Sequence, residues 1–139
     1  MKIAFAKRAA NAALALALSA SISAPYATAQ NFDLRQVLVG KWHQQTGSLV
    51  AEMVYQSNGR FTGIATTAGT NLFFYSEGTW EIRNGNTLVQ HNLNWSPKTL
   101  RHVDGTESPL IVPEWEHTQV QVVDHDHVRN QFGIAYRMK

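Results

Sequence analysis

The sequence predicts an all-β fold, an up-and-down antiparallel barrel of eight strands that follows one short helix. Beyond Gly40, hydrophobic and polar residues alternate with a period of two, and Val, Ile, Thr and aromatic residues are frequent. Turn residues recur at intervals of roughly ten positions, as in sandwiches and barrels. A closed barrel is favoured over an open sandwich because closure removes exposed strand edges.

The helix is expected just after Asp33, which suits an N-cap position. Leu34, Val37 and Leu38 follow at helical spacing, and Gly40 would end the helix. The alternation then predicts eight strands, at residues 40–45, 49–56, 60–67, 72–75, 77–83, 87–95, 115–123 and 127–138.

Three short segments between these strands predict tight turns. Ser57-Asn58-Gly59 and Asn84-Gly85-Asn86 contain Asn-Gly, which readily adopts the positive φ angles of two-residue hairpins. Asp124-His125-Asp126 is a third candidate. The long connection at 96–113 contains four residues that break regular structure, Pro97, Gly105, Pro109 and Pro113, and is either a solvated crossover or a functional loop.

The N-terminus resembles an export signal. Lys2, Lys7 and Arg8 precede an apolar run, and the small-residue segment Ala27-Thr28-Ala29 suits a cleavage site. We therefore expect residues 1–29 to be a signal peptide and 30–139 to form one mature domain, located in the periplasm or secreted. No later segment is long and apolar enough to predict a membrane-spanning helix.

Charge and cysteine content exclude several kinds of partner and chemistry. The leader carries three of the 12 Lys and Arg residues and none of the 10 acids, so nine basic residues against ten acids leave the mature chain near −1. Because the basic residues are dispersed, neither nucleic acid nor an anionic membrane is an expected partner. Cysteine is absent, so disulfides and thiolate chemistry are excluded.

The alternation also predicts which side chains face the interior. In the 77–83 strand the inward set is Gly78, Trp80 and Ile82. In the 87–95 strand the inward row is Val89, His91, Leu93 and Trp95, and the outward row is Gln90, Asn92 and Asn94. In the 127–138 strand the inward row is Val128, Asn130, Phe132, Ile134 and Tyr136.

Five of the inward residues are candidates for contact with a small ligand. Buried polar groups need partners, because an unpaired one costs roughly 1 to 3 kcal/mol. The candidates are Tyr55, His91, Trp95, Asn130 and Tyr136. The alternative is that the polar ones bond each other or water, and that Trp95, like Trp42, Phe61, Trp80 and Phe132, simply fills the core.

No motif in the chain predicts catalysis or a cofactor. A nucleophile elbow, a His-Glu-x-x-His helix and a phosphate-binding loop are missing, and Glu114 and Glu116 suit a solvated strand end. His125 and His127 are two residues apart and could hold a divalent metal, but an ordinary solvated turn is the better interpretation, so no metal is predicted. A barrel isomerase with His91 as general base stays an unsupported alternative.

The beginning and end of the predicted barrel resemble the lipocalin signature. Gly40-Lys41-Trp42 opens the first strand after the helix, and Arg137 lies near the end of the last strand. The resemblance implies that Trp42 closes one end of the barrel with Arg137 packed over it, a cation–π contact of about 0.5 to 2 kcal/mol. Gly78-Thr79-Trp80-Glu81-Ile82, followed by Asn84-Gly85-Asn86, is similar to a hairpin of small bacterial lipocalin-like domains.

A weaker likeness is to avidins. Leu38 to Trp42, the segment 58–63 and Asn94-Trp95 carry it, and Gln44, Ser48 and Trp95 would then stand at biotin-contacting positions. Ala65 occupies the place where that family has a ligand-bonding tyrosine.

The leading functional hypothesis is an exported lipocalin-like protein that binds a small, largely apolar molecule in an internal cavity of ligand size. Loops at 46–48, 67–71 and 96–113 would shape the open end. The principal alternative is a secreted protein-binding module or inhibitor with a solid barrel, in which the 96–113 loop makes the contacts. The sequence leaves the ligand's identity and the oligomeric state open.

Overall fold

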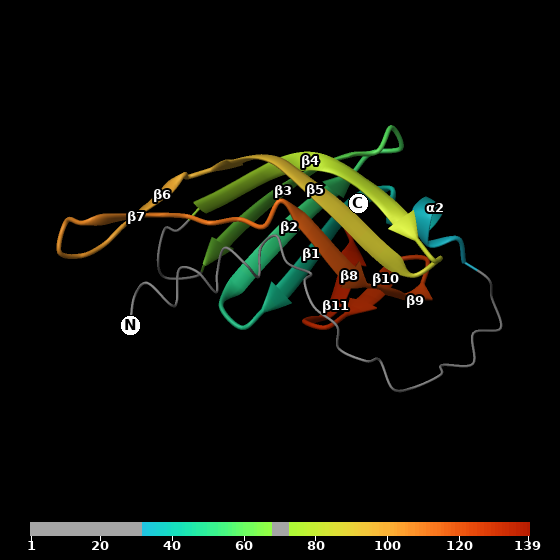
Figure 1. Ribbon diagram of the computed structural model, residues 1–139. Coiled ribbons are helices and arrows are strands. Elements are labelled where there is room, and N and C mark those ends of the chain that lie inside the picture. Colours follow the sequence, from blue (N-terminus) through green and yellow to red (C-terminus); the bar gives the residue numbers. More distant parts are fainter. Residues whose placement is uncertain (1–31, 68–72) are drawn as a thin grey trace.

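The computed structural model describes residues 32–67 and 73–139, and the expected signal peptide and most of the 67–71 loop lie outside these ranges. The described chain is one nearly closed antiparallel barrel with a short helix at one end (Figure 1). Its elements are α2 (Leu34–Leu38), β1 (Gly40–Thr46), β2 (Leu49–Tyr55), β3 (Arg60–Thr67), β4 (Phe73–Arg83), β5 (Thr87–Ser96), β6 (Thr99–Arg101), β7 (Glu107–Pro109), β8 (Trp115–Gln119), β9 (Gln121–Asp124), β10 (His127–Asn130) and β11 (Gly133–Arg137).

Nine strands form the barrel sheet, in the order β8-β5-β4-β3-β2-β1-β11-β10-β9, and β6 and β7 form a separate two-stranded sheet. The two edge strands, β8 and β9, are consecutive in the chain and are separated by Val120 alone. This one segment therefore pairs with β5 on one side and with β10 on the other, which brings the two edges of the sheet together.

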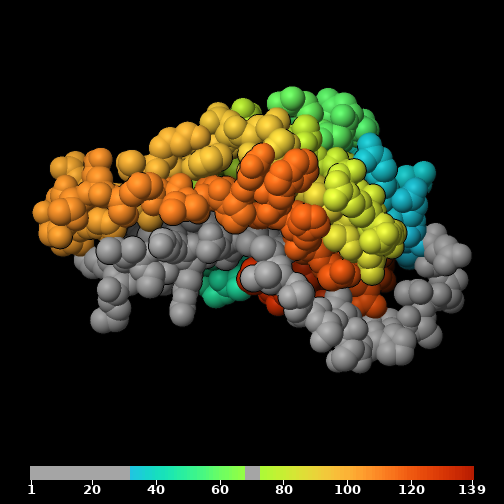
Figure 2. All heavy atoms as spheres, viewed as in Figure 1, coloured from blue at the N-terminus to red at the C-terminus, as the bar shows by residue number. Residues whose placement is uncertain are grey.

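The predicted all-β barrel with a short helix is confirmed, but the strand count differs for three reasons. The predicted 115–123 strand divides at Val120, and the predicted 127–138 strand folds back at Gln131 and Phe132 into the β10–β11 hairpin. The predicted 72–75 and 77–83 strands are one strand, β4. The 96–113 connection is also ordered, because β6 and β7 pair and project from the barrel as a hairpin (Figures 1 and 2).

The predicted local signals are confirmed at the helix and the turns. The Asp33 carboxylate accepts a hydrogen bond from the Arg35 backbone N–H at 3.0 Å, as an N-cap does. Asn84 and Gly85 both have positive φ, 54° and 75°, which suits a two-residue hairpin turn. The turns at 57–59 and 124–126 likewise join paired strands.

The helix end of the barrel carries the Trp42–Arg137 arrangement that the resemblance predicted. The two residues are direct cross-strand partners on β1 and β11, and the guanidinium carbon lies 4.6 Å from the indole centroid. Arg137 also donates to the carbonyls of Val37 and Val39, so it ties the helix to the last strand. Gly40 has a φ of 135°, a backbone conformation that other residues rarely adopt, and a Cβ there would lie 2.6 Å from the Arg137 guanidinium, so the position favours glycine.

A β-bulge in β5 decides which of its side chains face the interior. Gly78 pairs with Asn92 and Glu77 with Asn94, so Leu93 is an extra residue. The bulge brings the backbones so close that a Cβ on Gly78 would lie 1.8 Å from the His91 carbonyl oxygen. Alternation therefore shifts by one residue at Leu93, and residues on its two sides cannot be counted as one row.

Candidate functional site

The barrel interior has two apolar clusters with a polar layer between them. The first cluster lies at the helix end and contains Trp42, Tyr55, Phe61, Trp80 and Leu88, among others. The second lies at the opposite end and contains Leu49, Ala65, Phe74, Leu100, Leu110 and Val112. Inward positions between them on β1, β4, β5, β8 and β10 hold the buried polar residues Gln44, Ser76, Gln90, Asn92, Glu116, Thr118 and Asn130.

Gln90 and Glu116 are the centre of this layer. They are direct cross-strand partners on β5 and β8, and their side chains are 1 % and 3 % exposed. Thr118, the next inward residue on β8, is equally buried. None of the polar side-chain atoms of these three residues has a hydrogen-bond partner within the described part of the chain. Such atoms are costly to bury, so they mark a place that suits a bound molecule.

Burial dominates the electrostatics of the layer. It raises the pKa of Glu116 to about 8, although the nearby Asn92 side chain partly lowers it. The Asn92 amide nitrogen donates to the Pro113 carbonyl at 2.8 Å, and neither carboxylate oxygen of Glu116 has a hydrogen-bond partner in the described part of the chain. The Glu116 carboxyl therefore holds its proton through neutral pH unless a positive group lies beside it.

Tyr55 faces this layer from β2. Its ring packs against Trp80 with a centroid distance of 5.3 Å, in an edge-on arrangement. Burial, and then the charge of Glu116, raise the pKa of its hydroxyl above the ordinary value. The Tyr55 hydroxyl has no hydrogen-bond partner among the described residues. It is the one predicted site residue that faces the Gln90–Glu116 pair with an unpaired polar group.

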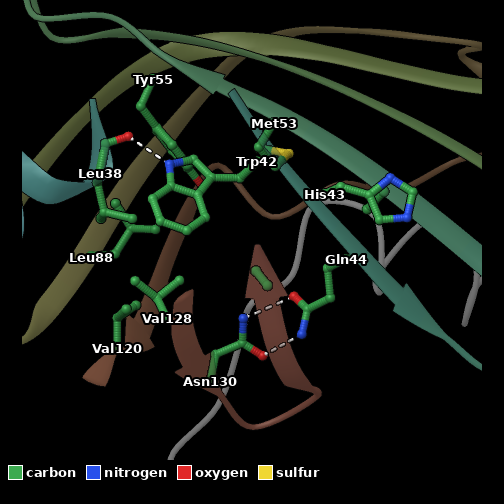
Figure 3. Close-up of a pocket in the computed structure, with 12 residues that line it drawn as sticks. Leu38, Trp42, His43, Gln44, Met53, Tyr55, Leu88, Val120, Val128 and Asn130 are labelled. Carbon is green, nitrogen blue, oxygen red and sulfur yellow. Dashed lines mark hydrogen bonds between the residues drawn. The ribbon is translucent and has the colours of Figure 1, made fainter. Parts of the chain in front are cut away.

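Gln44 and Asn130 form a second polar pair beside a small cavity. Their amides bond each other twice, at 3.0 and 2.9 Å, and so satisfy one another (Figure 3). The cavity has a volume of about 30 Å³, and its walls include Trp42, Met53 and Tyr55. That space suits one or two water molecules. It is far below the several hundred Å³ of drug-sized ligand pockets, so this cavity is not the ligand-sized one that we expected.

The predicted inward position of His91 is wrong. Because Leu93 is a bulge, the inward row of β5 is Leu88, Gln90 and Asn92, and His91 lies on the outer surface. There its ring stacks on Trp115, with centroids 3.9 Å apart and planes at 6°, and its Nε2 lies 3.3 Å from Glu114. His91 therefore cannot act as a general base inside the barrel.

The predicted inward positions of Ile134 and Tyr136 are also wrong. The turn at Gln131 and Phe132 reverses the chain, so Ala135 is the inward residue of β11 and its two neighbours are exposed. The Tyr136 ring packs against His43 on the outside, with centroids 4.8 Å apart.

Trp95 and Asn130 do lie inside, as predicted. Trp95 is beyond the bulge, packs against the second apolar cluster and has a buried indole N–H without a partner in the described chain. Lys98 lies 3.7 Å above its ring. Binding of a ligand by these residues stays a prediction. Of the other positions in the avidin likeness, Ser48 is exposed and the Gln44 amide is occupied by Asn130.

The sequence missed the most informative residues of the site. The alternation predicts Gln90 and Asn92 outside and Glu116 at a solvated strand end, whereas all three are buried. One signal was present in the sequence: Leu88 and Val89 are adjacent apolar residues, so the alternation in this strand permits either phase. Nothing local identifies the bulge that selects the phase.

The histidines near the β9–β10 turn pair with carboxylates of that turn. His127 Nδ1 lies 2.8 Å from Asp124, and His125 Nδ1 lies 3.0 Å from Asp126. In residues 32–67 and 73–139, no three His, Cys, Asp or Glu side chains are grouped so that they could hold a metal ion.

These features define the class as a small, nearly closed antiparallel β-barrel with a buried polar layer. Among solved structures, the chain is similar to the lipoprotein YedD from Klebsiella pneumoniae subsp. pneumoniae, with a TM-score of 0.47 and 8 % sequence identity over 73 % of this chain and 72 % of that one. No protein-family model and no curated protein matches the chain. Across the ranges that the structure describes, no helix has the length and apolarity needed to cross a membrane.

Proposed function

We propose that the protein is exported and binds a small molecule, largely apolar with one polar group, inside the barrel. The observation that supports the proposal best is the polar layer between two apolar clusters. Its Gln90, Glu116 and Thr118 side chains have no hydrogen-bond partner among the described residues, and Tyr55 faces them from the opposite wall. A molecule with an apolar body and a polar end would fit both kinds of wall.

The chemistry of the interior favours binding over catalysis. A general base or nucleophile needs an adjacent group that activates or orients it. The buried carboxyl of Glu116 has no such protein partner in the described chain, and the candidate base His91 lies outside. Export rests on the basic and apolar leader of the sequence, and the lipocalin-like resemblance is consistent with the Trp42–Arg137 contact.

Native mass spectrometry tests the proposal on the mature protein, purified from cells that process and export it. We expect a small adduct that denaturation releases. Thr118→Val should weaken its retention, since this change removes an inward hydroxyl at nearly constant volume, whereas Thr79→Val on the outer face of β4 should not. A bare polypeptide mass, combined with no saturable quenching of tryptophan fluorescence by small apolar probes, would contradict binding.

Protein binding by the β6–β7 hairpin is a second candidate. Leu100 and Leu110 fix the base of this hairpin in the second apolar cluster, while Val103 near its tip and Ile111 are 77 % and 70 % exposed. We expect that Val103→Asp would prevent chemical cross-linking of the hairpin to a partner in intact cells, while Val123→Asp would not. Unchanged cross-linking by the Val103→Asp variant would reject this candidate.

A further inference from the structure

The buried polar layer contains an acid without a compensating base. In the described ranges, Glu116 is the one Asp, Glu, Lys, Arg or His residue that is fully buried. Its chain neighbours Trp115 and His117 are exposed, and the inward residues beside it on β5 are the uncharged Leu88, Gln90 and Asn92. Tyr55 on β2 is the titratable group that faces it. The described part of the chain therefore supplies no positive charge to this carboxyl.

The unpartnered atoms of the layer are mostly hydrogen-bond acceptors. When Glu116 is ionised, four of them can only accept: both Glu116 carboxylate oxygens and the amide oxygens of Gln90 and Asn92. One of them, Gln90 Nε2, can only donate, and the hydroxyls of Ser76 and Thr118 can do either. The orientation of the Asn92 amide is fixed, since its nitrogen donates to the Pro113 carbonyl. A ligand that satisfies this layer must bring more donors than acceptors.

From these two observations we infer that the interior site receives a small organic cation, with an alkylammonium-type group paired with the Glu116 carboxylate. An ammonium group brings three donors and no acceptor. Its charge supplies what the wall around Glu116 lacks, and its carbon chain would contact the aromatic wall that Tyr55 and Trp80 form. The inference rests on the proposed function, because it specifies the ligand of the same site.

The expected pH dependence has a definite sign. Binding of a cation requires ionised Glu116, whose pKa is raised to about 8 in the folded protein. An alkylammonium group stays protonated to about pH 10. Affinity for the cation should therefore rise between pH 6 and pH 9, while affinity for a neutral ligand should not.

Three probes of equal length test the inference on the mature protein: n-butylammonium chloride, n-butanol and sodium butyrate. Binding is followed by NMR chemical shifts of the Gln90 and Thr118 side chains. At pH 9 we expect n-butylammonium to bind about 10-fold more tightly than n-butanol, which corresponds to one charge-assisted hydrogen bond, and butyrate to bind least.

Glu116→Gln should remove the preference for the cation, because it replaces the carboxylate by a neutral amide of the same shape. The matched control is Glu114→Gln, the same change two residues away at a side chain that is 73 % exposed and pairs with His91. This control should keep the preference. If Glu116→Gln does not fold, two measurements on the natural chain test the inference instead: the pH dependence of the affinity for n-butylammonium, and the comparison of its affinity with that of butyrate.

The outcomes separate the inference from the proposed function. Equal affinity for n-butanol and n-butylammonium, measured at the Gln90 and Thr118 side chains, would overturn the inference of a cationic ligand. It would leave the proposal of small-molecule binding in place. Absence of saturable shifts with all three probes, together with native mass spectra that show no adduct, would overturn both.

Discussion

Gln90 and Glu116 face each other across β5 and β8 with both side chains inside the barrel, although neither has a hydrogen-bond partner for its side-chain polar atoms in the part of the chain that the structure describes. In an antiparallel sheet the Cβ atoms of two directly opposite residues lie about 5 Å apart. The relationship matters because it puts a carboxyl of raised pKa next to a neutral amide in a place that water reaches poorly. Stability and binding should both depend on the ionisation of this one group.

Glu116 should make the protein less stable as pH rises. The folded state holds the proton up to about pH 8, whereas the unfolded chain releases it near pH 4.5, so the folded state binds more protons between these values. Glu116→Gln should remove this loss, which is at most about 4 kcal/mol between pH 5 and pH 9. Urea unfolding at pH 5 and pH 9 measures it. Glu114→Gln should show the same pH dependence of the unfolding free energy as the natural chain. If Glu116→Gln lost as much stability between pH 5 and pH 9 as the natural chain does, the raised pKa of Glu116 would be contradicted.

Tyr55→Phe should stabilise the protein without ligand by about 1 kcal/mol, because it removes a buried hydroxyl that has no hydrogen-bond partner within residues 32–67 and 73–139. Thermal unfolding followed by circular dichroism measures the change. Tyr75→Phe is the control, since the Tyr75 hydroxyl bonds Glu77 at the surface and its loss should change stability by less than about 0.5 kcal/mol. A clear loss of stability in Tyr55→Phe would mean that this hydroxyl has a partner.

Arg137→Met should destabilise the barrel by about 3 kcal/mol. The guanidinium lies over Trp42 and donates to the carbonyls of Val39 and His125, so its loss leaves these groups without their partner. Arg137→Lys should recover only part of the loss, because an ammonium cannot reproduce the planar fork. Arg83→Met, which removes an exposed pair with Glu81, should cost little. Similar urea midpoints for Arg137→Met and Arg83→Met would contradict the predicted role.

Gln44→Leu should cost about 1 to 3 kcal/mol, since it leaves the buried Asn130 amide without its reciprocal partner. A double-mutant cycle with Asn130→Leu should then show a coupling of similar size. Gln45→Leu, at the neighbouring exposed position, is the control. Strict additivity in the cycle would show that the two amides do not depend on each other.

Single cysteines can test the bulge directly, because the natural chain has none. A thiol reagent should modify Leu93→Cys quickly, since Leu93 is 52 % exposed, and Asn92→Cys slowly, since Asn92 is 4 % exposed. Fast labelling at 92 and protection at 93 would restore the simple alternation and place His91 inside.

The sequence by itself determined the period of two, the helix after Asp33 and the Asn-Gly hairpins, and the resemblance to the lipocalin signature implied the Trp42–Arg137 contact. Each of these depends on a few neighbouring residues or on the pairing of β1 with the C-terminal strand. Only the tertiary structure decided which side chains of β5 and β11 point into the barrel. At β5 the deciding feature is the extra residue Leu93, and at β11 it is a chain reversal at residues 131–132.

The physical reason is that alternation gives two rows of side chains but does not say where a row changes sides. A bulge forms where two backbones can approach closely, here Gly78 on β4 against His91 on β5, and these residues are remote in sequence. The same limit applies to Glu116, because a carboxylate at a strand end looks solvated until the strand that buries it is known. Local pattern thus predicted the helix, the Asn-Gly turns and the alternation, whereas cross-strand contact decided where strands divide and which polar residues lie inside.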